Sequence, residues 1–150
     1  MGVTKATLGS SEIARAWLRA GVTGLGDARV ENLQTLRAAS VGARLTLIRT
    51  PMLSQVGDVV RDADASLNTE VDVIRALSAA AAAAGRVHGI ILMVELGDLR
   101  EGIMPGDLER IVLETLRLPN LSLDGPIEWK PDTVGIWGPS RLPLKFDPGH

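Results

Sequence analysis

Short aliphatic runs alternate with segments of helical periodicity along most of this 150-residue chain. Runs of β-branched and aliphatic residues predict strands at Gly2–Ala6, Val22–Gly26, Ala43–Ile48, Ala65–Leu67, His88–Glu95 and Leu121–Leu123. Between consecutive runs, apolar residues recur at the spacing of an amphipathic helix. Repeated strand–helix units of this kind build α/β folds around a parallel sheet.

Five helices are predicted from apolar faces or helix-forming runs. In chain order, the residues that mark the five helices are Ile13, Ala14, Trp17 and Leu18 for the first; Val30, Leu33 and Leu36 for the second; Leu53, Val56, Val59 and Val60 for the third; the alanine run 79–84 for the fourth; and Leu108, Ile111, Val112 and Leu116 for the fifth. Ser10 is predicted to cap the first helix, and Thr69 begins a Thr-x-x-Asp pattern that resembles a capping box. Gly21 and Gly85 are predicted to end the first and fourth helices.

Two parallel architectures are compatible with this pattern, an open doubly wound sheet and a (β/α)8 barrel. The barrel is favoured because Lys5–Gly9 occupies the place of a glycine-rich phosphate loop. The Gly24-Leu25-Gly26 segment lacks the third glycine of a dinucleotide fingerprint, with Arg29 in its place. A full barrel needs about 250 residues. We therefore predict a partial (β/α)8 TIM-type barrel over residues 1–127, with about five βα units plus a sixth strand.

The pattern is lost from residue 128. Residues 128–150 contain four of the eight prolines and two of the three tryptophans, without a helical or alternating period. Proline interrupts helices and the ladders of central strands. We expect an irregular C-terminal tail.

Composition excludes several classes of function. The absence of cysteine rules out disulfides, thiol nucleophiles and thiolate metal sites, and the two distant histidines, His88 and His150, predict no zinc site. A net charge of −2 without a basic stripe argues against nucleic acid. The apolar runs are too short to span a membrane, and no secretory signal is visible. We expect a cytoplasmic protein that acts on a small molecule.

Lys5 stands at the end of the first predicted strand. Parallel α/β folds build their active sites at the carboxyl ends of strands. A lysine that is desolvated there can lose its proton near neutral pH and attack an aldehyde. Most lysines are solvated surface charges, so position alone leaves both interpretations open.

Five motifs follow one another at the carboxyl ends of the first five predicted strands. They are Val3–Ala6, Gly26–Leu33, Arg49–Met52, Ser66–Glu70 and Val94–Gly102. With these motifs in this order, residues 2–126 resemble the alanine racemase N-terminal domain family of pyridoxal-phosphate (PLP) enzymes. The similarity is greatest to the ornithine racemase-like branch.

The resemblance implies PLP as cofactor and a small amino acid as substrate. Lys5 would form the internal aldimine with PLP and act as one acid/base, and Arg100 would support that base beside the cofactor ring. Asp27, Arg29 and Asn68 would face the cofactor. The resemblance also implies that a homodimer can form, because alanine racemases complete their site from a partner subunit.

Each of these residues also has a structural interpretation. Arg100 could form a surface ion pair, Asp27 and Arg29 could be strand-exit groups, and Asn68 could cap the helix that follows Glu70. We expect His88 to satisfy a local hydrogen bond. The buried carboxylate of Glu95 is expected to pair with an arginine, Arg49 or Arg100.

The chain also departs from the family. It opens almost on the lysine strand, Gly125–Trp129 does not match the cofactor loop after the sixth strand, and the later strands and C-terminal domain are missing. It contains no tyrosine, the residue that supplies the second base in alanine racemases. We expect a truncated racemase of ornithine or alanine type, and whether it is an active enzyme alone is open. The alternatives are a non-catalytic PLP-binding protein of the same superfamily and a Schiff-base aldolase-like barrel.

Overall fold

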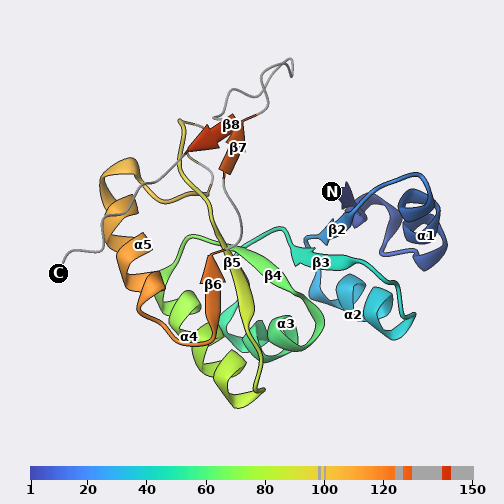
Figure 1. The fold of residues 1–150 in the computed structure, drawn as a ribbon, viewed down its shortest axis with the longest axis horizontal. Coiled ribbons are helices and arrows are strands. Elements are labelled where there is room, and N and C mark those ends of the chain that lie inside the picture. The colour runs from blue at the N-terminus through green and yellow to red at the C-terminus, as the bar shows by residue number, and fades with distance from the viewer. Residues whose placement is uncertain (98, 100, 124–126, 130–139, 143–150) are drawn as a thin grey trace.

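The computed structural model describes residues 1–97, 99, 101–123, 127–129 and 140–142. A sheet of six parallel strands forms its centre (Figure 1), and the strands are β1 (Gly2–Val3), β2 (Gly24–Asp27), β3 (Arg44–Leu47), β4 (Ala65–Asn68), β5 (His88–Leu92) and β6 (Leu121–Leu123). The helices between them are α1 (Ser11–Arg19), α2 (Val30–Ala38), α3 (Val56–Asp62), α4 (Val71–Ala83) and α5 (Leu108–Leu116). Every strand and helix of the predicted βα pattern is confirmed.

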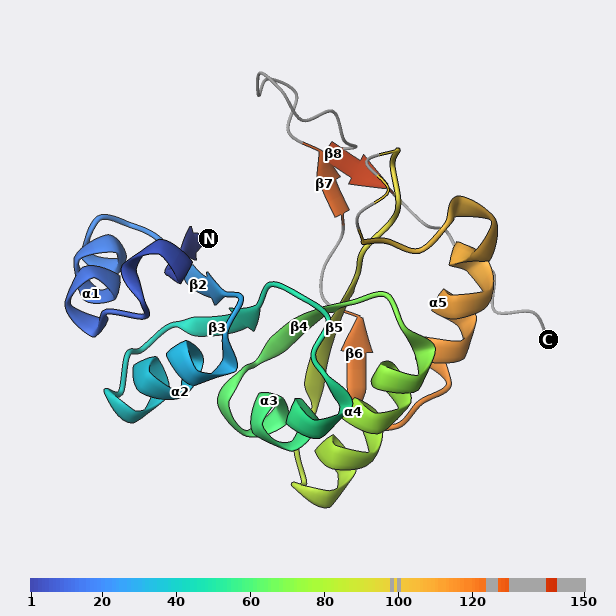
Figure 2. The same cartoon turned by 180° about the vertical axis from the view of Figure 1, so that it is seen from behind.

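The strand order decides between the two predicted architectures. The strands neighbour one another in chain order, from β1 at one edge to β6 at the other. Because strand–helix–strand crossovers are right-handed, a sheet that always advances in one direction carries all its helices on one face. A doubly wound sheet reverses direction and covers both faces. The fold is therefore a partial barrel with an open sheet, and α1 and α5 lie at its opposite ends (Figure 2).

The hydrophobic core lies between the sheet and its helices. Leu25 and Leu45 from the strands, Leu33 and Leu36 from α2, and Leu77 from α4 are completely buried. Burial of one such side chain contributes about 1.5–3 kcal/mol. The sheet and helices are thus held together by the residues whose spacing predicted them.

Three details of the predicted helices are wrong. Leu53 is 59% exposed because it lies in the 3-10 turn η2 (Leu53–Gln55) that precedes α3, and Leu116 is 54% exposed at the last residue of α5. Thr69 caps nothing: α4 begins after Glu70 without a side-chain cap, and the Thr69 hydroxyl instead bonds that of Thr50 at 3.2 Å. The predicted cap at Ser10 is confirmed, because its hydroxyl accepts the N–H of the third following residue at 3.4 Å.

Part of the predicted irregular tail is ordered as strands. β7 (Ile127–Trp129) and β8 (Ser140–Leu142) pair antiparallel as a separate two-stranded sheet, which corrects the expectation for the five of these six residues that lie in the predicted tail. The rest of the predicted tail lies outside the described residues. Among the described helices, none has the length and apolar character that crossing a membrane requires.

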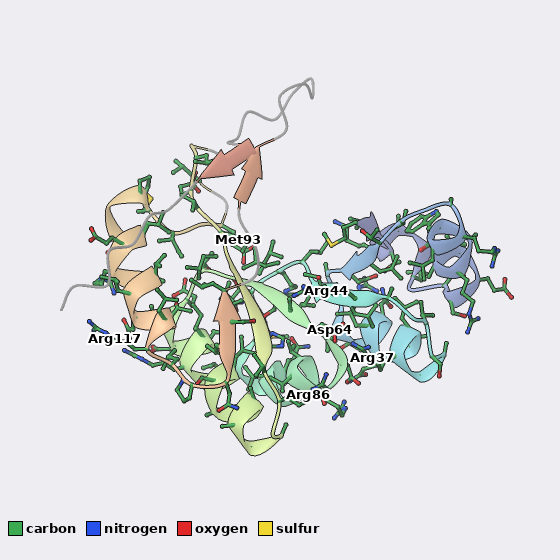
Figure 3. The ribbon with its side chains drawn as sticks, in the orientation of Figure 1. Arg37, Arg44, Asp64, Arg86, Met93 and Arg117 are labelled. Atoms are coloured by element: carbon green, nitrogen blue, oxygen red, sulfur yellow. The ribbon has the colours of Figure 1, made fainter. Side chains whose placement is uncertain are left out.

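Asp64 joins several elements at the amino ends of the strands. Its carboxylate accepts the backbone N–H of Leu45 at 2.8 Å and the Arg37 guanidinium at 3.0 Å. Its carbonyl accepts the N–H of Gly89 at 2.9 Å, and Figure 3 shows Arg37 and Arg44 beside it. This cluster fixes the sheet at the edge opposite to the strand exits.

Candidate functional site

The carboxyl ends of the strands carry most of the side chains that the sequence singles out. Lys5 follows β1, Asp27 ends β2 and Asn68 ends β4, while Arg49 follows β3 and Glu95 follows β5. Because all these strands are parallel, the groups share one edge of the sheet. This edge is the candidate site.

Lys5 begins a tight turn that is fixed to the neighbouring strand. The residue before it, Thr4, donates its N–H to the Gly26 carbonyl at 2.9 Å and its hydroxyl to Asp27 Oδ2 at 2.7 Å. The Thr4 carbonyl accepts the N–H of Gly9 at 3.3 Å, which closes the turn. The backbone that carries Lys5 is therefore anchored on both sides.

The Lys5 side chain itself is exposed. Its predicted place after the first strand is confirmed, although β1 is shorter than predicted and ends at Val3, so that Lys5 begins the 3-10 turn η1 (Lys5–Thr7). Any desolvation of this amine has to come from a group that covers it.

Asp27 is fully buried and accepts hydrogen bonds on both carboxylate oxygens. Oδ2 accepts from Thr4, and Oδ1 accepts from the Arg29 N–H at 2.9 Å and the Asn32 side-chain amide at 3.1 Å. A buried carboxylate is costly unless such donors compensate its charge. Asp27 thus holds the Lys5 turn against the start of α2. The cofactor contact that the resemblance implied for Asp27 stays a prediction.

Gly9 brings the same turn close to α2. It has a φ of +69°, and a Cβ at this position would lie 2.9 Å from the Cβ of Asn32. Only glycine combines this backbone conformation with so close an approach at little cost. The Lys5 turn therefore contacts α2 at two places, through Asp27 and through Gly9.

An open cleft of about 420 Å³ lies at the exits of β2 and β3. Arg29 at the exit of β2 and Arg49 at the exit of β3 line it, together with Asn32, Met52 and Gln55. Both arginine side chains are exposed. The predicted site residue Arg29 thus shares a cleft with a second arginine from the adjacent strand exit.

Asn68 belongs to a buried polar network instead of capping α4. Its amide donates to the Ser66 carbonyl at 2.8 Å and to the Ser66 hydroxyl at 3.0 Å. That hydroxyl lies 2.9 Å from His88 Nε2, which confirms the local hydrogen bond expected for His88. Burial lowers the pKa of His88 to about 4. Cofactor contact by Asn68 stays a prediction.

A second open cleft, of about 320 Å³, has an acidic lining at the exits of β4 and β5. Glu70, Glu95 and Glu101 line it with Leu99 and Met104. Glu95 is buried and accepts the N–H groups of Gly97 and Leu99, and Glu101 accepts the Thr50 N–H at 3.3 Å. The predicted catalytic residue Arg100 lies outside the described residues.

Sequence reasoning missed the contribution of Thr4 to this edge, because the Thr4–Asp27 bond depends on how β1 and β2 are aligned. The motif Arg49–Met52 signalled the place of Arg49 at a strand exit, but its position beside Arg29 in one cleft was not predicted. Within the described residues no group of three or more acidic or histidine side chains could hold a metal ion.

Residues 1–129 match the family described as alanine racemase, N-terminal domain. An ornithine racemase from Acetoanaerobium sticklandii is 37% identical over 124 residues, covering 82% of this chain and 35% of that protein. A lysine racemase from Thermotoga maritima is 33% identical over 103 residues, covering 69% of this chain and 29% of that protein. The chain thus spans about a third of the length of these curated relatives.

Solved structures share the fold at lower sequence identity. An alanine racemase from Clostridium difficile 630 superposes with a TM-score of 0.75 at 18% identity, covering 83% of this chain and 34% of that one. PipY of Synechococcus elongatus PCC7942, solved with PLP bound, superposes with a TM-score of 0.73 at 19% identity, covering 83% of this chain and 59% of that one. Both support the assignment of the open sheet as a partial barrel.

Proposed function

The chain belongs to the alanine racemase N-terminal domain family, and we propose that it serves PLP-dependent racemisation of an amino acid, with Lys5 as the cofactor-binding residue. The observation that supports this proposal is the position of Lys5 in the fold. Lys5 leaves the first strand at the carboxyl edge of the sheet, on a turn anchored through Thr4 to Asp27. The identity of 37% with an ornithine racemase supports the racemase branch.

The residues at this edge fit a cofactor that carries an aldehyde and a phosphate. Lys5 offers an accessible primary amine, and Arg29 and Arg49 offer cations in the neighbouring cleft. When bound, PLP supplies an electron sink that stabilises the negative charge left at Cα after loss of a proton.

Lys5 would hold the cofactor through Nζ and move a proton at the same atom. The Thr4–Asp27 hydrogen bond anchors the backbone from which the Lys5 side chain extends. Racemisation needs an acid/base on each face of the planar carbon. The proposed role of Arg100, support of the base on the Lys5 side, remains a prediction from the resemblance.

We propose ornithine, or a similar amino acid with a cationic side chain, as the substrate. The curated relatives are ornithine and lysine racemases. The acidic cleft at the exits of β4 and β5 places Glu70 and Glu101 on the same edge as Lys5, and carboxylates there favour an ammonium group over a methyl group.

Covalent labelling tests the role of Lys5. The chain is incubated with PLP, reduced with borohydride, digested and mapped over its three lysines, Lys5, Lys130 and Lys145. We expect most label on Lys5, loss of that label in Lys5→Ala, and unchanged labelling of Lys5 in the control Lys145→Ala. Label spread evenly over the three lysines contradicts the proposal.

A non-catalytic PLP-binding protein is the second candidate. The observation that favours it is the PLP-bound PipY structure, of which this chain covers 59%, compared with 34% of the alanine racemase. Both candidates predict label on Lys5. Only a racemase exchanges the α-proton of ornithine with deuterated solvent faster than free PLP does, and loses this excess in Lys5→Ala.

A further inference from the structure

The cleft between Arg29 and Arg49 has an excess of positive charge. In the part of the chain that the structure describes, no carboxylate lies within ion-pair distance of either guanidinium, and the side-chain contact of Arg49 is a hydrogen bond to the Thr50 carbonyl at 3.3 Å. By contrast, an acidic side chain within 4.0 Å accompanies each of Arg37, Arg61, Arg75, Arg86 and Arg110. The two cleft arginines are thus available for a ligand.

The remaining lining suits a small anion. α2 begins at this cleft, and its first turn leaves backbone N–H groups without intrahelical acceptors. The side-chain amides of Asn32 and Gln55 add polar groups, and Met52 adds an apolar wall. The exposed carboxylate of Glu31 lies on the same lining and repels an anion. Removal of this negative charge should therefore strengthen anion binding.

We propose that this cleft binds the carboxylate or phosphate group of a small molecule between Arg29 and Arg49. Two guanidiniums on adjacent strand exits can present paired N–H donors to the oxygens of one anion. Asn32 links the cleft to the Lys5 turn, because it lines the cleft, bonds Asp27 and packs on Gly9. The anion site does not depend on Lys5 chemistry, and only the identity of its natural ligand rests on the proposed function.

Titration by ¹⁵N NMR tests the site with two probes, inorganic phosphate and acetate, at ionic strength held constant with chloride. We expect saturable shifts of the backbone amides of residues 30–32 and of the Arg29 and Arg49 Nε–H signals. Stronger binding of phosphate assigns the cleft to a phosphate-bearing ligand, and stronger binding of acetate assigns it to a carboxylate such as that of an amino acid. Shifts that do not saturate for either probe overturn the proposal.

Substitutions at exposed positions make the test specific. Arg29→Gln and Arg49→Gln should each weaken anion binding about tenfold, the effect of losing one charge-assisted contact of about 1.4 kcal/mol. Glu31→Gln should tighten binding, and the matched control Arg19→Gln on α1 should leave it unchanged. Lys5→Ala should also leave phosphate binding unchanged, so failure of the anion site and failure of the Lys5 proposal are separable. Undiminished binding in the Arg29→Gln, Arg49→Gln double variant contradicts the site.

Discussion

His88 is the residue whose protonation opposes the fold. The Asn68 amide donates to the Ser66 hydroxyl, which also lies 2.9 Å from His88 Nε2, and the tautomer of the ring decides which of these two atoms donates. Burial lowers the pKa of His88 to about 4, so the imidazole is neutral in the folded chain at neutral pH. Protonation of His88 would place a charge inside this buried polar network, which costs free energy.

We predict that stability falls as the pH is lowered from about 6.5 to about 4. In this range the unfolded chain binds a proton at His88 and the folded chain does not, so the free energy of unfolding decreases with decreasing pH. The loss should approach about 3 kcal/mol, which is the shift of the His88 pKa converted to free energy.

Urea unfolding at pH 7 and pH 4.5 measures this loss, with His88→Gln as the comparison. Glutamine cannot be protonated, so the variant should lose less stability between the two values. The other histidine, His150, is present in both proteins, and their difference therefore reports His88 alone. Equal losses in the two proteins would exclude His88 as the cause.

At the candidate site, the sequence predicts where residues lie better than what they contact. Lys5 follows the first strand as its pattern predicts, since a strand exit is a local property. The contacts of Asp27 were not predictable, because they require β1 and β2 to align so that Thr4 and Asp27 are neighbours. The exposure of Lys5 depends on its whole environment, and the sequence left it open.

Asp64 illustrates how elements are joined by a single carboxylate. The ladder between β3 and β4 begins at the pair Thr46–Ala65, so the N–H of Leu45 takes the Asp64 carboxylate as its acceptor. We predict that Asp64→Ala lowers the free energy of unfolding by about 1–3 kcal/mol, because a backbone donor at the strand start loses its partner. Urea denaturation monitored by circular dichroism measures this change.

Arg37→Ala is the matched control for Asp64. Its ion pair with Asp64 is about one-third exposed on both sides, with side-chain values of 35% and 32%. Such pairs contribute about 0–1 kcal/mol. A cost for Arg37→Ala as large as that for Asp64→Ala would show that the ion pair, and not the Leu45 hydrogen bond, holds this edge.

Periodicity predicts the existence of elements and fails at their ends. The predicted face of α2, formed by Val30, Leu33 and Leu36, is buried as expected. Leu53 and Leu116 fall at helix ends, where the helical phase starts or stops, and their burial was predicted wrongly. β7 and β8 pair with each other over three residues each, too short a run to produce an alternating pattern.

For the whole molecule, the decisive observation is that the strand order never reverses. The absence of a phosphate loop favoured the barrel from the sequence, but only the pairing of each strand with its chain neighbours establishes it. Within the described residues, the six-stranded sheet has its two edges at β1 and at β6, and sheet edges are sites where further strands can pair.

The connection between β5 and α5 presents apolar side chains to solvent. Leu96, Leu99 and Met104 are 58%, 80% and 55% exposed, and the last two line the acidic cleft. Clustered exposed apolar residues mark surfaces that bind other chains. We predict that the chain self-associates through this apolar patch, defined as Leu96, Leu99 and Met104.

Sedimentation velocity at increasing protein concentration tests this prediction. The sedimentation coefficient of the unmodified chain should rise with concentration, and the rise should disappear in the Leu96→Lys, Leu99→Lys double variant, because each lysine places a charge in the contact. Val87→Lys is the control, since Val87 is 64% exposed but precedes β5 at the opposite edge of the sheet. If the double variant associates as strongly as the unmodified chain, contact through the open edges at β1 and β6 becomes the better explanation.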